Sequence, residues 1–200
     1  VMELEGLLNG VFAQHFPLSL GCSLTFEQNY GGVEGDSASM AEFCAILSSL
    51  SEVPILQDIA ITGSVNQMGR SQAIGGVNEK IEGFFRTCVR RGLTGTQGAI
   101  IPRANLTGLL LEADVVEAIK KGHFHLWAVD HVDEALELLM NMPAGSIYDA
   151  PGTVSVYARV YEKLTHFDTI MLARKQGQSI APAKPLSVQP AMPWTHHHKI

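Results

Sequence analysis

The sequence predicts a layered α/β arrangement in which helices and strands alternate along the chain. Segments with apolar residues at helical spacing alternate along the chain with short segments in which apolar and polar residues alternate, as in strands. Glycine or proline separates many of these segments. Apolar residues make up 46% of the 200 residues and charged residues 17%, which is ordinary for a globular protein. The chain therefore suits one domain, or one domain with an extension.

The first part of the chain predicts two helices and two strands. Residues 1–16 have one apolar helical face that ends at Pro17, and residues 18–26 alternate as a half-buried strand does. A helix is expected over 38–50. A strand-like run over 55–65 follows it.

The same alternation continues to residue 140. The expected elements are a strand over 71–74, a helix from about Val77, a strand over 99–101, a helix that begins near Leu106 or Asp114 and ends at Lys121, a strand over 125–129 and a helix over 132–140.

A turn-rich segment over 143–152 marks a boundary. Beyond it, apolar residues with three-then-four spacing from Tyr157 onward predict another helix, either docked on its own domain, which we favour, or forming a seam between copies. The predicted division is a main domain over 1–145, a helical extension over 146–176, and a tail over 177–200 rich in Pro, Gln and Ser. We expect this tail to be disordered.

Composition narrows the range of partners and compartments. A net charge of −6 without a basic cluster argues against nucleic acid as the main partner. No two of the three cysteines, Cys22, Cys44 and Cys88, have C-x-x-C spacing, which is typical of buried thiols in a reducing compartment. No apolar run is long enough to span a bilayer, and the N-terminal residues lack a secretory signal, so we expect a cytoplasmic protein without membrane attachment.

One segment suggests nucleophilic chemistry. Residues 31–39 read GGVEGDSAS, so that Ser37 follows a glycine turn and directly precedes the helix expected over 38–50. A serine at a helix start lies among unpaired backbone N–H groups and the positive end of the helix dipole. Negative charge that forms on a substrate carbonyl beside it would be stabilised there.

A serine hydroxyl needs a neighbouring base, and a lysine can serve when its surroundings lower its pKa from about 10.4 by roughly 3 units. No histidine of this chain lies in a glycine-rich setting, whereas Lys80 ends the segment GGVNEK. The apolar residues 73–77 would favour a neutral amine at Lys80. Thr62, at the end of the strand-like run, is a candidate for orienting that amine.

Each residue alone also has an ordinary structural interpretation. A serine at a helix start is most often a cap, and most lysines are solvated surface charges. The catalytic interpretation of Ser37 and Lys80 depends on the order of the two segments, their separation, and the threonine-bearing strand between them.

Several linked motifs between Leu18 and Gly145 resemble the proteolytic domain of the Lon protease family, in the branch that has EGDSAS around its nucleophile. In chain order they are EGDSAS within residues 30–39, DIAITG at 58–63, QAIGGVNEK at 72–80, AIIPRAN at 99–105 and VDEAL at 132–136. The resemblance implies an α+β fold with helices packed on a mixed sheet. It also implies that Ser37 is the nucleophile and Lys80 the general base of a Ser-Lys dyad that hydrolyses peptide bonds, with Thr62 close to the lysine.

The acidic stretch before the nucleophile departs from the best-known bacterial members. These have proline and glycine where this chain has Asp36 and Ser39. By the resemblance, Glu34, Gly35 and Asp36 support the site. Within salt-bridge range, Asp36 would hold Lys80 protonated and silence the base.

The resemblance also implies partners. Enzymes of the family couple this domain to an ATP-driven unfoldase on the same polypeptide, cleave unfolded or damaged proteins, and form closed rings, commonly of six. The sequence contains no G-x-x-x-x-G-K-[ST] phosphate loop. We therefore expect ATP and magnesium only in an ATPase domain outside this chain, no cofactor or metal within it, and a chain that is a fragment of a larger protein.

Two other functions stay open. A glycine-rich turn that opens a helix is also an anion site, so residues 31–39 could cradle a phosphate as in small-molecule kinases, with Glu34 or Asp36 on magnesium and Lys80 on the phosphate. The chain could instead be a latent module whose role is ring assembly. Histidines 123, 125 and 131 invite a zinc hypothesis, but an exposed His-x-His strand is the favoured interpretation.

Overall fold

The computed structural model describes residues 2–18, 20–26, 35–150 and 152–176. The predicted disordered tail over 177–200 and the supporting residue Glu34 lie outside the described residues. In order, the described elements are α1 (Met2–Phe12), α2 (Ser39–Ser51), β1 (Ile59–Ile61), β2 (Ser64–Val65), β3 (Ser71–Gln72), α3 (Val77–Arg91), β4 (Gly98–Pro102), a 3₁₀ helix η1 (Arg103–Gly108), α4 (Ala113–Lys120), β5 (His125–Val129), α5 (Val132–Met140) and α6 (Val156–Lys175).

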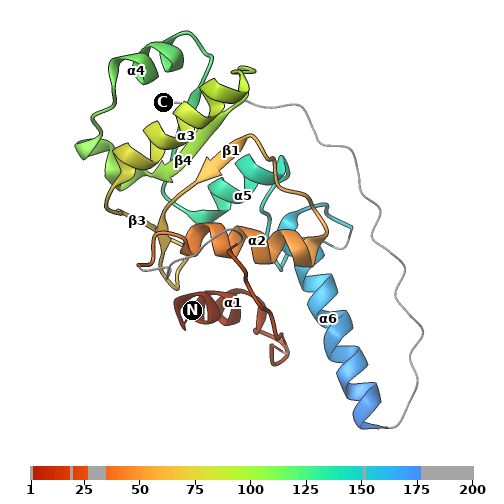
Figure 1. Ribbon diagram of the computed structural model, residues 1–200. Helices are drawn as coiled ribbons and strands as arrows, with labels where there is room; N and C mark the ends of the chain where they lie inside the picture. The colour runs from red at the N-terminus through yellow and green to blue at the C-terminus, as the bar shows by residue number, and fades with distance from the viewer. Residues whose placement is uncertain (1, 19, 27–34, 151, 177–200) are drawn as a thin grey trace.

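A parallel sheet of three strands in the order β1-β4-β5 forms the centre of the molecule (Figure 1). Its register places Ala60 beside Ala99 and Ile100 beside Trp127. The strands β2 and β3 form a separate antiparallel hairpin. Helices plus a small, mostly parallel sheet agree with the predicted α+β fold.

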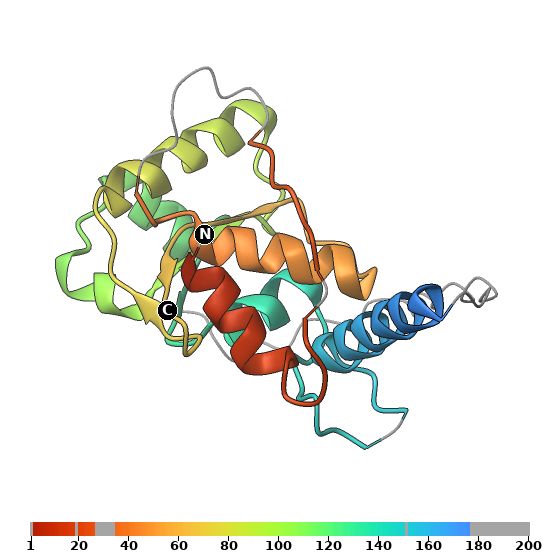
Figure 2. The same ribbon diagram turned by 90° about the horizontal axis from the view of Figure 1, so that it is seen from below.

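Helices cover both faces of the sheet, because successive side chains of a strand point to opposite sides. Ile100 and Trp127 belong to one core with residues of α1, α2, α5 and α6, whereas Ala99, Ile101 and Leu126 belong to another with residues of α3 and α4. The two views agree on this layering, with α3 and α4 on one side of the strands and α2 and α5 on the other (Figures 1 and 2). The sequences of β4 and β5 are each nearly continuous apolar runs, as expected for strands of a sheet that is buried on two faces.

The C-terminal helix α6 docks on its own domain, as favoured from the sequence. Tyr157, Val160 and Leu164 are buried in the core that α2 also lines, and the Phe12 ring meets the Tyr157 ring edge to face at a centroid distance of 5.4 Å. The distal end of α6 extends away from the rest of the molecule (Figure 1), and Leu172 there is half exposed. Among the described helices, none is both long and apolar enough to cross a membrane.

The structure differs from the predicted elements at two places and decides between two alternatives at a third. The described residues of 18–26 form no strand, because no other described strand pairs with them. The predicted strand over 55–65 is divided into β1 and β2, and the chain turns at Thr62 and Gly63 between them. Of the two predicted starts of the next helix, Asp114 is correct to within one residue, because α4 begins at Ala113, whereas Leu106 lies in the 3₁₀ helix η1.

Candidate active site

Ser37 lies in a tight turn that leads from Gly35 into α2. Gly35 has a φ of 86°, a conformation that glycine adopts without strain. The carbonyl oxygen of Ser37 accepts the backbone N–H of Gly63 at 2.8 Å and the hydroxyl of Thr62 at 3.4 Å. The chain that leaves β1 therefore fixes the backbone of the candidate nucleophile.

Further hydrogen bonds join the same two segments on either side of Ser37. The N–H of Met40 donates to the carbonyl oxygen of Gly63 at 3.2 Å, and the N–H of Val65 donates to the Ser39 hydroxyl at 3.0 Å. Ser39 is buried, so its hydroxyl is an internal link between α2 and β2. This explains why the serine that departs from the bacterial pattern at position 39 is compatible with the fold.

Lys80 lies in the first turn of α3 and points toward Ser37. Its Nζ is 2.9 Å from the Ser37 Oγ and 3.4 Å from the Thr62 Oγ1. The helix starts after Gly76, whose φ of 66° turns the chain into α3. The Lys80 N–H donates to the Gly76 carbonyl oxygen at 3.1 Å. The structure thus brings the predicted nucleophile, base and orienting threonine together.

A residue that the sequence did not assign to the site holds the segment before α3. Asn105 accepts the N–H of Ile74 at 3.1 Å and donates its side-chain N–H to the carbonyl oxygen of Ile74 at 2.8 Å. Asn105 lies within η1, and its side chain bonds across to another segment rather than capping a helix. Asn105 fixes the approach to the glycine turn before Lys80, and only its place in the AIIPRAN motif hinted at a role.

A pocket of about 240 Å³ opens beside the Lys80 amine. Ala60, Ile61 and Thr62 line it from β1 and its end, Ala99 from β4, and Lys80 and Ile81 from α3. The apolar walls around the lysine come from these elements, not from residues 73–77 as predicted. Lys80 itself is solvent-exposed.

Backbone donors are available where negative charge would form on a substrate. Within the described residues, no acceptor is seen for the N–H groups of Ser37 and Ala38. These amides lie at the start of α2, where the helix dipole is positive. A carbonyl oxygen placed beside Ser37 could therefore accept hydrogen bonds from the turn.

The carboxylate of Asp36 is turned toward the hairpin. Its Oδ2 accepts the hydroxyl of Ser64 at 2.7 Å, and no ion pair with Lys80 occurs in the described part of the chain. The arrangement in which Asp36 holds Lys80 protonated is absent from this structure. The bonds that are present, Asp36 to Ser64 and Lys80 to Ser37, give no support to the hypothesis of a phosphate-binding loop.

Two of the three histidines considered for zinc, His125 and His131, are held by other contacts. His125 Nε2 lies 2.7 Å from the carbonyl oxygen of Gly95, and His131 Nε2 lies 3.0 Å from that of Met68. The Asp133 N–H donates to His131 Nδ1 at 3.3 Å, so His131 caps α5. The described residues contain no cluster of three or more groups suited to a metal ion.

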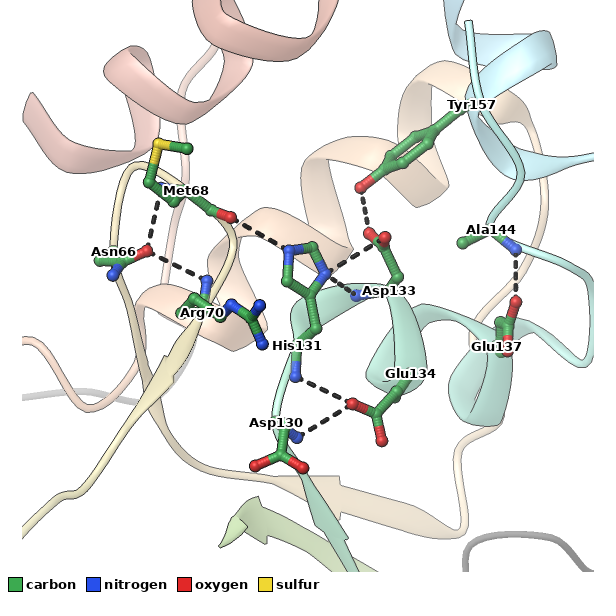
Figure 3. A network of polar contacts seen from close by, with 10 residues as sticks. All are labelled: Asn66, Met68, Arg70, Asp130, His131, Asp133, Glu134, Glu137, Ala144 and Tyr157. Carbon is green, nitrogen blue, oxygen red and sulfur yellow. Dashed lines mark hydrogen bonds and ion pairs between the residues drawn. The ribbon is translucent and has the colours of Figure 1, made fainter. Parts of the chain in front are cut away.

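His131 belongs to a polar network that joins the β2–β3 turn to α5 and α6 (Figure 3). The Tyr157 hydroxyl donates to the Asp133 carboxylate, and an Asp133 oxygen lies 3.1 Å from His131 Nδ1. Burial, together with the neighbouring Asp133 charge, raises the pKa of Tyr157 above its ordinary value. The network anchors the far end of the hairpin whose near end contacts the candidate site.

Comparison with known proteins gives a family match. Residues 31–142, more than half of the chain, match the family described as the Lon protease (S16) C-terminal proteolytic domain. The chain is 52% identical over 151 residues to a Lon protease homolog of Escherichia coli (strain K12), which covers 76% of this chain and 25% of that protein.

Two further relatives are also named as Lon proteases or Lon protease homologs. A Lon protease homolog of Haemophilus influenzae is 47% identical over 139 residues, covering 70% of this chain and 23% of that protein. An archaeal Lon protease of Thermococcus kodakarensis is 34% identical over 139 residues, covering 70% of this chain and 19% of that protein. The chain thus spans a quarter or less of the length of these relatives.

Proposed function

Because the chain belongs to the Lon protease (S16) C-terminal proteolytic domain family, we propose that it is a serine endopeptidase domain with Ser37 as nucleophile and Lys80 as general base. The 2.9 Å separation between Ser37 Oγ and Lys80 Nζ is the observation that carries the proposal. A base must lie within hydrogen-bond reach of the proton that it removes, and this distance meets the requirement.

The proposed reaction follows from these positions. The neutral Lys80 amine takes the Ser37 proton as the Oγ attacks the carbonyl carbon of a peptide bond. The N–H groups of Ser37 and Ala38 stabilise the oxyanion of the tetrahedral intermediate. The intermediate collapses when Lys80 gives the proton to the leaving amine, and an acyl-enzyme on Ser37 remains. Water, deprotonated by Lys80, then releases the acid product and restores both groups.

Thr62 has a supporting role in this proposal. Its hydroxyl lies 3.4 Å from the Lys80 amine and 3.4 Å from the Ser37 carbonyl oxygen. The hydroxyl can accept a hydrogen bond from the amine while donating its single proton to the carbonyl. Thr62 thereby links the orientation of the base to the backbone of the nucleophile.

The substrate and its delivery are part of the proposal as well. We infer that the domain cleaves unfolded or damaged polypeptides in the cytoplasm and is coupled to an ATP-driven unfoldase of a longer polypeptide, in a ring of identical subunits, with six as the expected number. The support is the match to proteins named as Lon proteases, of which this chain spans a quarter or less. ATP and magnesium belong to the unfoldase in this proposal.

Cleavage of a labelled unfolded protein by the full chain tests the proposal. Ser37→Ala and Lys80→Ala should each lower the cleavage rate at least about 100-fold, as expected for loss of a nucleophile or of a general base. Ser48→Ala is the matched control, because it removes a serine hydroxyl of α2 that donates to the Val53 carbonyl oxygen and has no contact with Ser37 or Lys80 among the described hydrogen bonds. Unchanged cleavage in either dyad variant would refute the dyad. A stable ring without any cleavage would favour the assembly module instead.

A further inference from the structure

The residue next to the nucleophile carries a negative charge that could compete for the base. Asp36 directly precedes Ser37, whose Oγ is 2.9 Å from Lys80 Nζ. Asp36 is exposed, so the surrounding packing leaves room for its side chain to turn. Its direction in the structure is set by a hydrogen bond at 2.7 Å from the Ser64 hydroxyl.

Ser64 is well placed to hold this carboxylate. It lies in β2 and is only 1% exposed, so its hydroxyl is shielded from competition by water. A hydroxyl has one proton to donate, and a charged acceptor at 2.7 Å forms a stronger bond than the Gln72 amide oxygen at 3.4 Å. The Ser64 hydroxyl therefore donates its proton in a hydrogen bond to Asp36 rather than to Gln72.

Among the described residues that line the pocket with Lys80, none is a carboxylate. The pocket wall beside the amine consists of Ala60, Ile61 and Ala99, which carry no charge. On α3 itself, an oxygen of Glu79 lies 3.7 Å from where a Cβ on Gly76 would be, at the start of the helix. On α2, Glu42 lines a separate pocket with Leu4 and Leu8. Among described residues, Asp36 is thus the carboxylate that adjoins the nucleophile.

We propose that Ser64 is a positioning residue that keeps the Asp36 carboxylate on the hairpin side and away from Lys80, so that the lysine can lose its proton and act as base. This inference rests on the proposed function. Without the Ser64 hydroxyl, the carboxylate is drawn by the positive amine, and an opposite charge within about 4–6 Å favours the protonated form of a lysine. In this proposal the β2–β3 hairpin, through Ser64 and Asp36, controls how readily Lys80 loses its proton.

The test measures the Lys80 proton directly. The full chain is labelled with a limiting amount of acetic anhydride across a range of pH, and acetylation of Lys80 is quantified by peptide mass spectrometry, since only the neutral amine reacts. In Ser64→Ala the midpoint of Lys80 labelling should rise by about one pH unit. Cleavage of a labelled unfolded protein near neutral pH should fall about tenfold, because tenfold less of the amine is neutral.

A second substitution separates positioning from simple structural damage. Ser64→Ala combined with Asp36→Asn should return the labelling midpoint and most of the cleavage rate, because the competing charge is gone. Ser51→Ala removes another fully buried hydroxyl, at the end of α2, and should leave the Lys80 midpoint unchanged. An unaltered midpoint in Ser64→Ala, or a loss of cleavage that Asp36→Asn does not restore, would overturn the inference.

If Ser64→Ala does not fold, the single variant Asp36→Asn still tests the role of Ser64. Asp36→Asn alone should shift the Lys80 midpoint by less than about 0.3 pH unit, because the carboxylate is already held elsewhere; a fall of about one unit would show that it already acts on the lysine. The labelling requires no turnover. A chain that shows the expected labelling shifts but cleaves nothing would therefore refute the proposed function and leave the role of Ser64 standing.

Discussion

The backbone N–H of Gly63 donates to the carbonyl oxygen of Ser37 at 2.8 Å, and the Gly63 carbonyl oxygen accepts the N–H of Met40 at 3.2 Å. One residue of the chain leaving β1 thus holds both the turn that contains the nucleophile and the first turn of α2. Since β1 is hydrogen-bonded to β4, the position of Ser37 is set by the sheet rather than by a free loop.

This relationship makes Gly63 sensitive to substitution. A Cβ at this position would lie 2.5 Å from the Met40 methyl group and 3.1 Å from Pro102 Cγ. We predict that Gly63→Ala lowers the free energy of unfolding by about 1–3 kcal/mol, because Met40 is fully buried and must shift. Denaturant unfolding measures the change, and the cleavage rate should fall with it as Ser37 moves.

Gly83→Ala is the matched control for that prediction. Gly83 lies within α3, and a Cβ there would meet nothing within 4 Å. Alanine has the higher helix propensity, so this variant should gain up to about 1 kcal/mol. Equal stability of Gly63→Ala and the parent chain would show that the close approach at Gly63 is relieved at no cost.

Thr62→Val removes the hydroxyl between the base and the nucleophile while keeping the side-chain shape. Loss of one or two neutral hydrogen bonds near the reacting groups should slow cleavage by about threefold to tenfold. Thr169→Val is a suitable comparison, because the Thr169 hydroxyl donates to the Thr165 carbonyl oxygen within α6, which contributes no residue to the candidate site. A Thr62→Val chain that cleaves as fast as Thr169→Val would remove the orienting role from Thr62.

The buried Tyr157 predicts a loss of stability at alkaline pH. Its pKa is raised in the folded state by burial and by Asp133, so the folded form keeps its proton where the unfolded form loses it. The contribution is fully present below the ordinary tyrosine pKa near 10 and falls as the pH rises above that value, by up to about 1.4 kcal/mol per pH unit. Denaturant unfolding at a series of pH values, from about 8 up to the highest pH at which the chain stays chemically intact, measures how the free energy of unfolding changes with pH.

Tyr157→Phe should abolish that alkaline contribution and lower stability at neutral pH. Asp133 would lose the hydroxyl that donates to it, and a hydrogen bond to a charged group contributes about 1.5–3 kcal/mol. Tyr148→Phe changes an exposed ring and should alter neither quantity. If the parent and Tyr157→Phe lose stability equally above pH 10, the alkaline effect has another origin.

The sequence predicted the parts of the site that local pattern encodes. Ser37 was recognisable because a glycine turn meets a helical apolar run, and Lys80 because a second glycine turn does the same at the start of α3. Buried strands such as β4 and β5 were also evident, since a continuous apolar run between turns needs no partner to be seen.

Contacts between distant segments were beyond such patterns. Ser64 reaches Asp36 across 28 residues, and Asn105 reaches Ile74 across 31, and neither residue type is unusual for its local sequence. The separation of β1 from β2 at Thr62 and Gly63 likewise depends on the turn of Ser37, to which both are bonded. Side-chain bonds of this kind exist only once the chain has folded.

In the proposed mechanism, Lys80 activates Ser37. The most direct test is the rate at which a peptidyl fluorophosphonate modifies the chain, with the modified residue located by peptide mass spectrometry. We expect an adduct on Ser37 that forms at least about 100-fold more slowly in Lys80→Met, which keeps roughly the length of the side chain but not its amine. No adduct at Ser37, or an adduct that forms equally fast in Lys80→Met, would contradict it.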